Sequence, residues 1–169
     1  MKLKLTLLLM LSALLLQAQP GKSSLGLRAG GVSGITFKYV DDELRGFELI
    51  AGAKEGGMVL TCLLQKYRPI GAGRISGLSL YTGGGAHAGY SKYMEEIIHV
   101  VEGWHYHAYH EVTSPVLGGD FVLGLEYQFE SIPMNLSLDY KPYVEVFGQK
   151  DFRVDLWDIG FSIRYAFNQ

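Results

Sequence analysis

The chain has 169 residues, of which 48% are hydrophobic, 12% aromatic and 19% charged, and its formal net charge is −2. This length predicts one domain, the aromatic content excludes a disordered chain, and the charge argues against a nucleic-acid partner. The single cysteine, Cys62, excludes an intramolecular disulfide.

The N-terminal segment predicts a secretory signal peptide. Two early lysines precede an apolar run over residues 5–16, and the small residue Ala18 follows it. A charged start, a short apolar core and a small residue before the cleavage point are typical of such peptides. We expect residues 1–18 to be the signal peptide and residues 19–169 the mature domain; an uncleaved membrane anchor is the alternative.

After the N-terminal segment, no stretch is long and apolar enough for a transmembrane helix. The apolar residues instead recur mainly at every second position, which is the period of a β-strand. Eight segments are predicted as strands: 25–30, 35–39, 47–54, 58–67, 78–90, 121–130, 134–141 and 157–167. In segment 121–130, for example, Glu126 stands between Leu125 and Tyr127. The pattern does not decide the faces of segment 58–67.

The connections between the eight strands alternate between two ends of the predicted barrel. One end holds 41–45, 69–77 and 131–133, and the other holds 31–34, 55–57, 91–118 and 149–154. An even number of strands places both termini at the first end. Residues 91–118 are far longer than an ordinary connection, and one long loop opposite short turns resembles the asymmetry of outer-membrane barrels.

Alternation alone fits a soluble barrel, whose apolar face fills the interior, and a membrane barrel, whose apolar face meets lipid. Two patterns favour lipid outside. The opposite face mixes glycines such as Gly26 with charged residues such as Arg28, which suits a narrow interior filled by long side chains. Aromatic residues also fall near strand ends, where interfacial girdles need them: Tyr39, Phe47, Tyr90, Phe129, Tyr140, Tyr165 and Phe167.

Several segments carry a family resemblance. Residues 158–165, Asp-Ile-Gly-Phe-Ser-Ile-Arg-Tyr, match a polar-x-Gly-x-x-apolar-x-aromatic pattern that resembles the recognition signal of the barrel-assembly machinery. Residues 25–31, 83–87, 124–127 and 135–139 look like small outer-membrane barrels of the Bacteroidetes type and, more loosely, the OmpA and OmpX type. The resemblance implies an all-β fold, an eight-stranded antiparallel up-and-down transmembrane β-barrel. It departs at the C-terminus, where two polar residues follow the last aromatic.

The inward-facing charges form the first candidate site. The predicted lumenal residues are Arg28, Lys38, Lys54, Lys141 and Arg164, which are positive, and Glu48, Glu126, Glu130, Asp139, Glu145 and Asp158, which are negative. A nearly balanced set inside a barrel just wide enough for side chains predicts an ion-paired plug. A narrow conducting path is the alternative.

The loop of residues 91–118 carries the second candidate site. Its histidines are His99, His105, His107 and His110, and its large aromatic residues are Trp104, Tyr106 and Tyr109. Clustered imidazoles could bind zinc or copper. We predict a hairpin turn at residues 102–103, with 97–101 paired against 104–108. That register divides the histidines two and two between the faces, so we expect no metal site and instead an aromatic contact surface.

A third candidate is catalytic. His87 lies on a predicted strand with Ser91 nearby, and outer-membrane lipid-modifying enzymes do use serine and histidine. A triad also needs an acidic partner, and the sequence places none. We expect His87 to be a lumenal histidine among the charges and Cys62 to be a small packing residue.

The sequence therefore predicts a monomeric, non-enzymatic outer-membrane barrel of a Gram-negative bacterium, without a cofactor. Its expected partners are membrane lipid, the barrel-assembly machinery and a surface partner at residues 91–118. The role would be envelope integrity or surface contact. A secreted, lipocalin-like ligand-binding barrel is the alternative function, and an outer-membrane lipid-modifying enzyme is the third.

Overall fold

The computed structural model describes residues 21–54, 56–70, 76–101, 104–147 and 151–167. The strands in this part of the chain are β1 (Gly21–Gly30), β2 (Ser33–Asp41), β3 (Arg45–Lys54), β4 (Gly57–Pro69), β5 (Leu78–Val101), β6 (Trp104–Gln128), β7 (Met134–Tyr140), β8 (Tyr143–Phe147), β9 (Asp151–Asp155) and β10 (Ile159–Ala166). No helix in the described part is long and apolar enough to cross a membrane.

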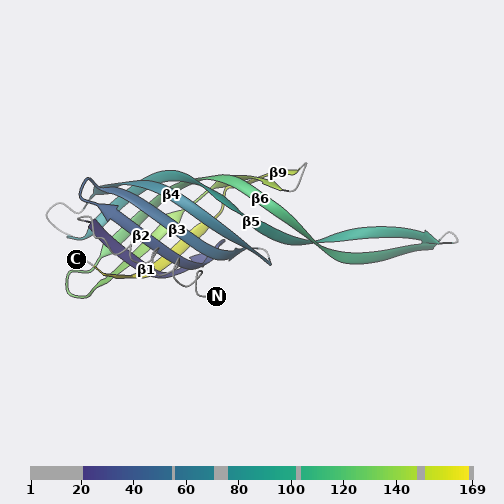
Figure 1. Ribbon diagram of the computed structural model, residues 1–169, viewed down its shortest axis with the longest axis horizontal. Helices are drawn as coiled ribbons and strands as arrows, with labels where there is room; N and C mark the ends of the chain where they lie inside the picture. The colour runs from purple at the N-terminus through teal and green to yellow at the C-terminus, as the bar shows by residue number, and fades with distance from the viewer. Residues whose placement is uncertain (1–20, 55, 71–75, 102–103, 148–150, 168–169) are drawn as a thin grey trace, which may run out of the picture.

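The strands close into an antiparallel barrel. Strands β1 to β6 pair in chain order, β6 pairs with β7 and β8, and β10 pairs with both β7 and β1. The closing ladder between β1 and β10 sets Leu25 opposite Tyr165 and Arg28 opposite Ser162. Strand β1 begins and β10 ends at the same end of the barrel (Figure 1). The predicted eight-stranded antiparallel barrel is therefore confirmed.

Two of the eight barrel strands are interrupted. Strands β7 and β8 pair with successive parts of β6 and are separated by Lys141 and Pro142, and β9 and β10 form the neighbouring interrupted strand. Proline has no N–H for a sheet ladder, but its carbonyl still accepts a hydrogen bond from the Phe121 backbone N–H at 3.0 Å. The Lys141 backbone N–H bonds the Asp158 carbonyl at 2.7 Å, so both interruptions lie side by side.

The two faces of the barrel wall have opposite chemistry. Outward-facing side chains are apolar and exposed, as for Leu27 at 63%, Leu64 at 68% and Trp157 at 82%. Inward-facing positions include Arg28 and Arg164, which are buried, together with a small apolar cluster around Ile50. This is the reverse of a soluble barrel, in which charged residues meet water.

Strand β4 resolves the segment whose faces the sequence left open. Its inward residues are Val59, Thr61, Leu63, Gln65 and Tyr67, and its outward residues include Met58, Leu60, Cys62 and Leu64. Cys62, which the sequence predicts to be a small packing residue, is instead exposed on the outer face. Apolar residues occur on both faces of this strand, so its sequence does not alternate clearly between apolar and polar residues.

Glycine makes room for the long inward side chains. A Cβ built on Gly160 would lie 2.2 Å from the Arg28 guanidinium carbon. A Cβ built on Gly118 would lie 2.3 Å from the His87 ring. A side chain at either position would therefore displace the buried Arg28 or His87 side chain.

The long connection predicted at 91–118 is instead strand. Strand β4 pairs with β5 only as far as Tyr90, and β8 pairs with β6 only from Val116. The intervening residues 91–101 and 104–115 pair only with each other in the described part of the chain, and we call them the ribbon. Figure 1 shows the ribbon extending far beyond the barrel. A two-stranded segment without a packed face lacks the alternation that marks barrel strands.

Other predicted details of this end have mixed outcomes. The register sets Ile97 opposite Ala108 and Val101 opposite Trp104, which confirms the predicted hairpin pairing. The turn residues 102–103 lie outside the described residues. The connection predicted at 149–154 is wrong in part, because β9 begins at Asp151 and continues the ladder to β8.

Candidate functional site

The barrel interior gathers the predicted lumenal charges. The structure places these predicted lumenal residues inside: Arg28, Lys38, Glu48, Glu126, Asp139, Lys141, Asp158 and Arg164. Lys54 and Glu145 are also buried there. The inward placement of Glu130 is wrong, because it lies exposed beyond the end of β6.

Sequence reasoning missed Asp120. Its carboxylate is fully buried and contacts Lys141 and His87. Asp120 stands two residues before the inward Val122, so it is in phase with the inner face of β6. The alternation therefore extends to Asp120, one residue before the predicted start of this strand at Phe121.

Glu48 is the centre of a cluster near the end of the barrel where β1 begins. Its carboxylate pairs with the Arg164 guanidinium and with Lys38 Nζ at 3.3 Å. It also accepts hydrogen bonds from Thr36 Oγ1 at 2.7 Å and from Gln65 Nε2 at 2.6 Å. A buried carboxylate that is paired and fully hydrogen-bonded is stable in the charged form.

Glu126 forms the second carboxylate of this terminus-end cluster. Its Oε2 atom lies 3.0 Å from Lys38 Nζ and 3.6 Å from Arg164 Nη1, and it accepts a hydrogen bond from the Tyr67 hydroxyl at 3.3 Å. Arg164 Nη1 also donates to Ser137 Oγ at 2.7 Å. Lys38 and Arg164 therefore each contact both carboxylates of this cluster.

A chain of alternating charges fills the rest of the lumen. Arg28 Nη1 donates to both oxygens of Asp139, at 2.7 and 2.6 Å, and Arg28 Nη2 lies 3.6 Å from Asp158. Lys141 Nζ lies 3.0 Å from the Asp158 carboxylate and 2.9 Å from the Asp120 carboxylate, so it links the two. Lys141 and Asp158 lie at the two strand interruptions, whereas Asp120 lies within the continuous strand β6.

His87 continues this chain toward the ribbon end. Its Nδ1 atom lies 2.8 Å from Asp120 Oδ2, and its Nε2 atom lies 3.2 Å from Glu145 Oε2. Lys54 Nζ reaches the same Glu145 oxygen at 2.6 Å and lies 4.0 Å from the centre of the Tyr143 ring.

Two tyrosines connect the terminus-end cluster with the rest of the lumen. Tyr67 and Tyr81 stack with ring centres 5.2 Å apart, and Lys38 Nζ lies 4.1 Å from the centre of the Tyr81 ring. The Tyr81 hydroxyl donates to Asp139 at 3.3 Å. These rings supply a cation–π contact and a hydrogen bond in a space where water is largely excluded.

The charges inside nearly balance. In the described part of the chain, the buried lysines and arginines are Arg28, Lys38, Lys54, Lys141 and Arg164, and the inward carboxylates are Glu48, Asp120, Glu126, Asp139, Glu145 and Asp158. The carboxylates exceed these cations by one, and His87 lies between two of them. Arg153 also approaches Glu145, to 3.9 Å, but it stays partly exposed.

The structure does not assemble a catalytic pair from the candidate residues His87 and Ser91. His87 and Ser91 stand four residues apart on one face of β5, and a strand rises about 3.3 Å per residue. Their backbones are therefore about 13 Å apart, too far for a hydrogen bond between the side chains. An acidic partner for His87 does exist in Asp120, but Glu145 occupies the nitrogen that a nucleophile would need.

The histidines of the ribbon lie at the register positions predicted for them. His99 is opposite Tyr106 and His110 is opposite Glu95, on one face, whereas His105 and His107 belong to the other. In the described part of the chain no three His, Cys, Asp or Glu side chains are grouped to hold a metal ion. The side chains of 95–108, including Trp104 and Tyr106, lie outside the described residues. Tyr109 is 65% exposed.

No protein-family model and no curated protein matches the chain. Among solved structures, it is similar to the N-terminal β-barrel domain of Pseudomonas aeruginosa OprF, with a TM-score of 0.48 and 14% identity over 89% of this chain and 100% of that chain. A likeness at this level carries no argument about activity. The barrel assignment depends on the strand pairing described above.

Proposed function

We propose that this chain is a non-enzymatic outer-membrane β-barrel protein of a Gram-negative bacterium. In this proposal residues 1–18 direct export, residues 19–169 span the membrane as a monomer, and the barrel-assembly machinery inserts it. One observation carries the proposal: the outer face of the wall is apolar while the charges are inside. Exposed apolar surface on this scale is stable in lipid and is a liability in water.

The aromatic residues support this orientation. Tyr127 with Phe129 and Tyr165 with Phe167 form edge-to-face pairs near the end where β1 begins, with ring centres 4.9 and 5.5 Å apart. Trp157 lies two residues before the start of β10, toward the other end of the barrel, and is 82% exposed. Aromatic side chains at both levels match the girdles that outer-membrane barrels place at the two membrane–water interfaces.

The proposed role is envelope integrity or contact with a surface partner through the ribbon. The ribbon extends beyond the barrel wall (Figure 1) and exposes Met94 at 69% and Tyr109 at 65%. Large exposed side chains of this kind are enriched at protein interfaces. In the proposed topology, the ribbon is outside the cell and both termini are in the periplasm.

The interior gives no support to the lipocalin-like alternative. A lipocalin binds its ligand in a cavity inside the barrel, and ligand cavities are lined mainly by apolar side chains. Here paired charges occupy the interior, and most large apolar side chains face outward.

Cell fractionation tests the proposal. The mature protein should be recovered with outer membranes, and the folded form should migrate differently from the boiled form on a gel. Recovery as a soluble protein of the periplasm or the medium would refute the membrane assignment.

A further inference from the structure

A cavity opens at the end of the barrel where β1 begins and β10 ends, and we call it the cup. Its volume is about 310 Å³, which lies at the lower end of the range for small-molecule sites. Its lining comes from seven strands and the turn between β2 and β3. Glu126 and Tyr67 line it and also belong to the terminus-end cluster, so the paired charges close the cup from below.

Some of the charged residues that line the cup have no ion-pair partner among the described residues. Asp41 is bound by Arg45, whose backbone N–H and guanidinium group donate to it at 2.7 and 2.8 Å and lower the pKa of the Asp41 carboxyl. Glu126 is bound by Lys38. By contrast, in the described part of the chain neither Lys22 nor Asp42 has an ion-pair partner.

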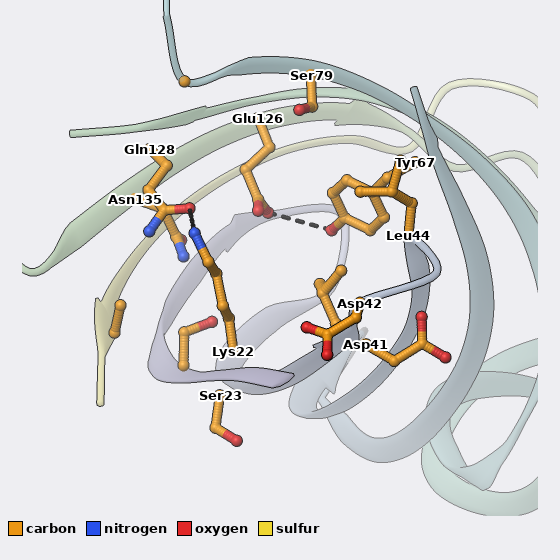
Figure 2. Close-up of a pocket in the computed structure, with 14 residues that line it drawn as sticks. Lys22, Ser23, Asp41, Asp42, Leu44, Tyr67, Ser79, Glu126, Gln128 and Asn135 are labelled. Carbon is orange, nitrogen blue, oxygen red and sulfur yellow. Dashed lines mark hydrogen bonds between the residues drawn. The ribbon is translucent and has the colours of Figure 1, made fainter. Parts of the chain in front are cut away.

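The two uncompensated groups have opposite charge. Among the described residues, the Lys22 ammonium donates to the neutral amide oxygen of Gln128, at 3.2 Å. Figure 2 shows Gln128 and Asn135 on one side of the cup and Asp41 and Asp42 on the other, with Lys22 reaching up from below. A positive and a negative group therefore face one small space.

The cup also contains an unmet acceptor. Asn135 is 6% exposed, and its Oδ1 atom has no hydrogen-bond partner among the described residues. A buried polar atom without a partner destabilises a fold, so a donor from outside the chain would be favoured there. The apolar side chains of Val40 and Leu44 also line the cup and suit an aliphatic group.

We propose that the cup binds a small zwitterion of dipeptide size. The ligand carboxylate pairs with Lys22, its ammonium pairs with Asp42, and an N–H donates to Asn135 Oδ1. This site is separate from the proposed membrane role and from the ribbon, because the cup lies at the opposite end of the barrel.

The test uses the folded mature chain in detergent micelles, with glycyl-leucine as the probe. Protein-detected NMR follows the side-chain amide signals of Asn135 and Gln128. Glycyl-leucine should bind saturably, and removing either ligand charge, by N-acetylation or by C-terminal amidation, should raise the Kd by about three- to tenfold.

Two variants assign each ligand charge to one residue. Lys22→Gln should weaken binding of the free dipeptide but not of its amide, and Asp42→Asn should weaken binding of the free dipeptide but not of the N-acetyl form. The matched controls are Lys66→Gln and Glu43→Gln, which remove exposed charges outside the cup lining and should leave every Kd unchanged. A variant that only disturbed the fold would weaken all three probes alike.

Three results would overturn the proposal. One is the absence of a saturable shift with free glycyl-leucine. Another is equal affinity for the free, acetylated and amidated probes. The last is an equal loss of affinity for all three probes in both Lys22→Gln and Asp42→Asn. Retention of heat-modifiable migration confirms that each variant is folded.

Discussion

The Arg164 guanidinium on β10 pairs with the Glu48 carboxylate on β3 across the interior, although β1 and β2 stand between these strands in the sheet. The pair therefore ties opposite parts of the wall together. Because both groups are buried, each depends on the other for compensation of its charge.

Replacing this cation should destabilise the barrel. Arg164→Leu leaves Glu48 and Glu126 with Lys38 as their remaining cation, and the free energy of unfolding should fall by about 3–5 kcal/mol in a dry lumen, and by less if water enters. Urea unfolding in micelles measures this. Glu126→Gln, which removes a partly exposed carboxylate, should be milder; equal effects would contradict the assigned roles.

His87 should be important for stability without being catalytic. His87→Leu removes the ring that lies between the Asp120 and Glu145 carboxylates and takes a hydrogen-bond partner from them. We expect a loss of about 1–3 kcal/mol in unfolding free energy, because a buried polar group is left without its hydrogen-bond partner. His87→Gln can still donate to one carboxylate and should recover part of the loss. An unchanged unfolding free energy in His87→Leu would contradict the inference that His87 links Asp120 and Glu145.

The paired charges should block ion flow through the barrel. An eight-stranded barrel is just wide enough for its own side chains. The series of paired charges from Arg28 to Glu145 fills the interior of this barrel. Purified protein in planar bilayers should give no large, stable channels. Conductance as large as that of a porin would refute the prediction that paired charges block the barrel interior.

The ribbon should be dispensable for folding. Glu96 and Tyr109 are direct partners across it, so replacing residues 97–108 with Asn-Gly joins them through a two-residue hairpin turn and preserves the register. The shortened protein should fold and remain heat-modifiable. External protease should cut wild-type cells in the ribbon but spare cells carrying the shortened form. Failure to fold, or a ribbon cut only after the outer membrane is opened, would contradict the proposed topology.

The sequence predicted the barrel where one face of a strand was uniformly apolar. Segment 157–167 is an example, with Ile163 outside and Arg164 inside. Around Cys62, where both faces of β4 carry apolar residues, the sequence predicts a strand but not its faces. In the ribbon it predicts the central hairpin but not that the strands continue from the barrel. The individual ion pairs were beyond sequence reasoning, because Arg164 and Glu48 are brought together by closure of the barrel rather than by any local spacing.

Cys62 offers the most direct test of the central claim that the outer face meets lipid. It is the single cysteine of the chain and lies exposed in the middle of β4. A bimane label on this thiol, after refolding into vesicles with brominated acyl chains, should show blue-shifted emission and strong quenching. Water-like emission, without quenching by the brominated chains, would contradict a lipid-facing wall.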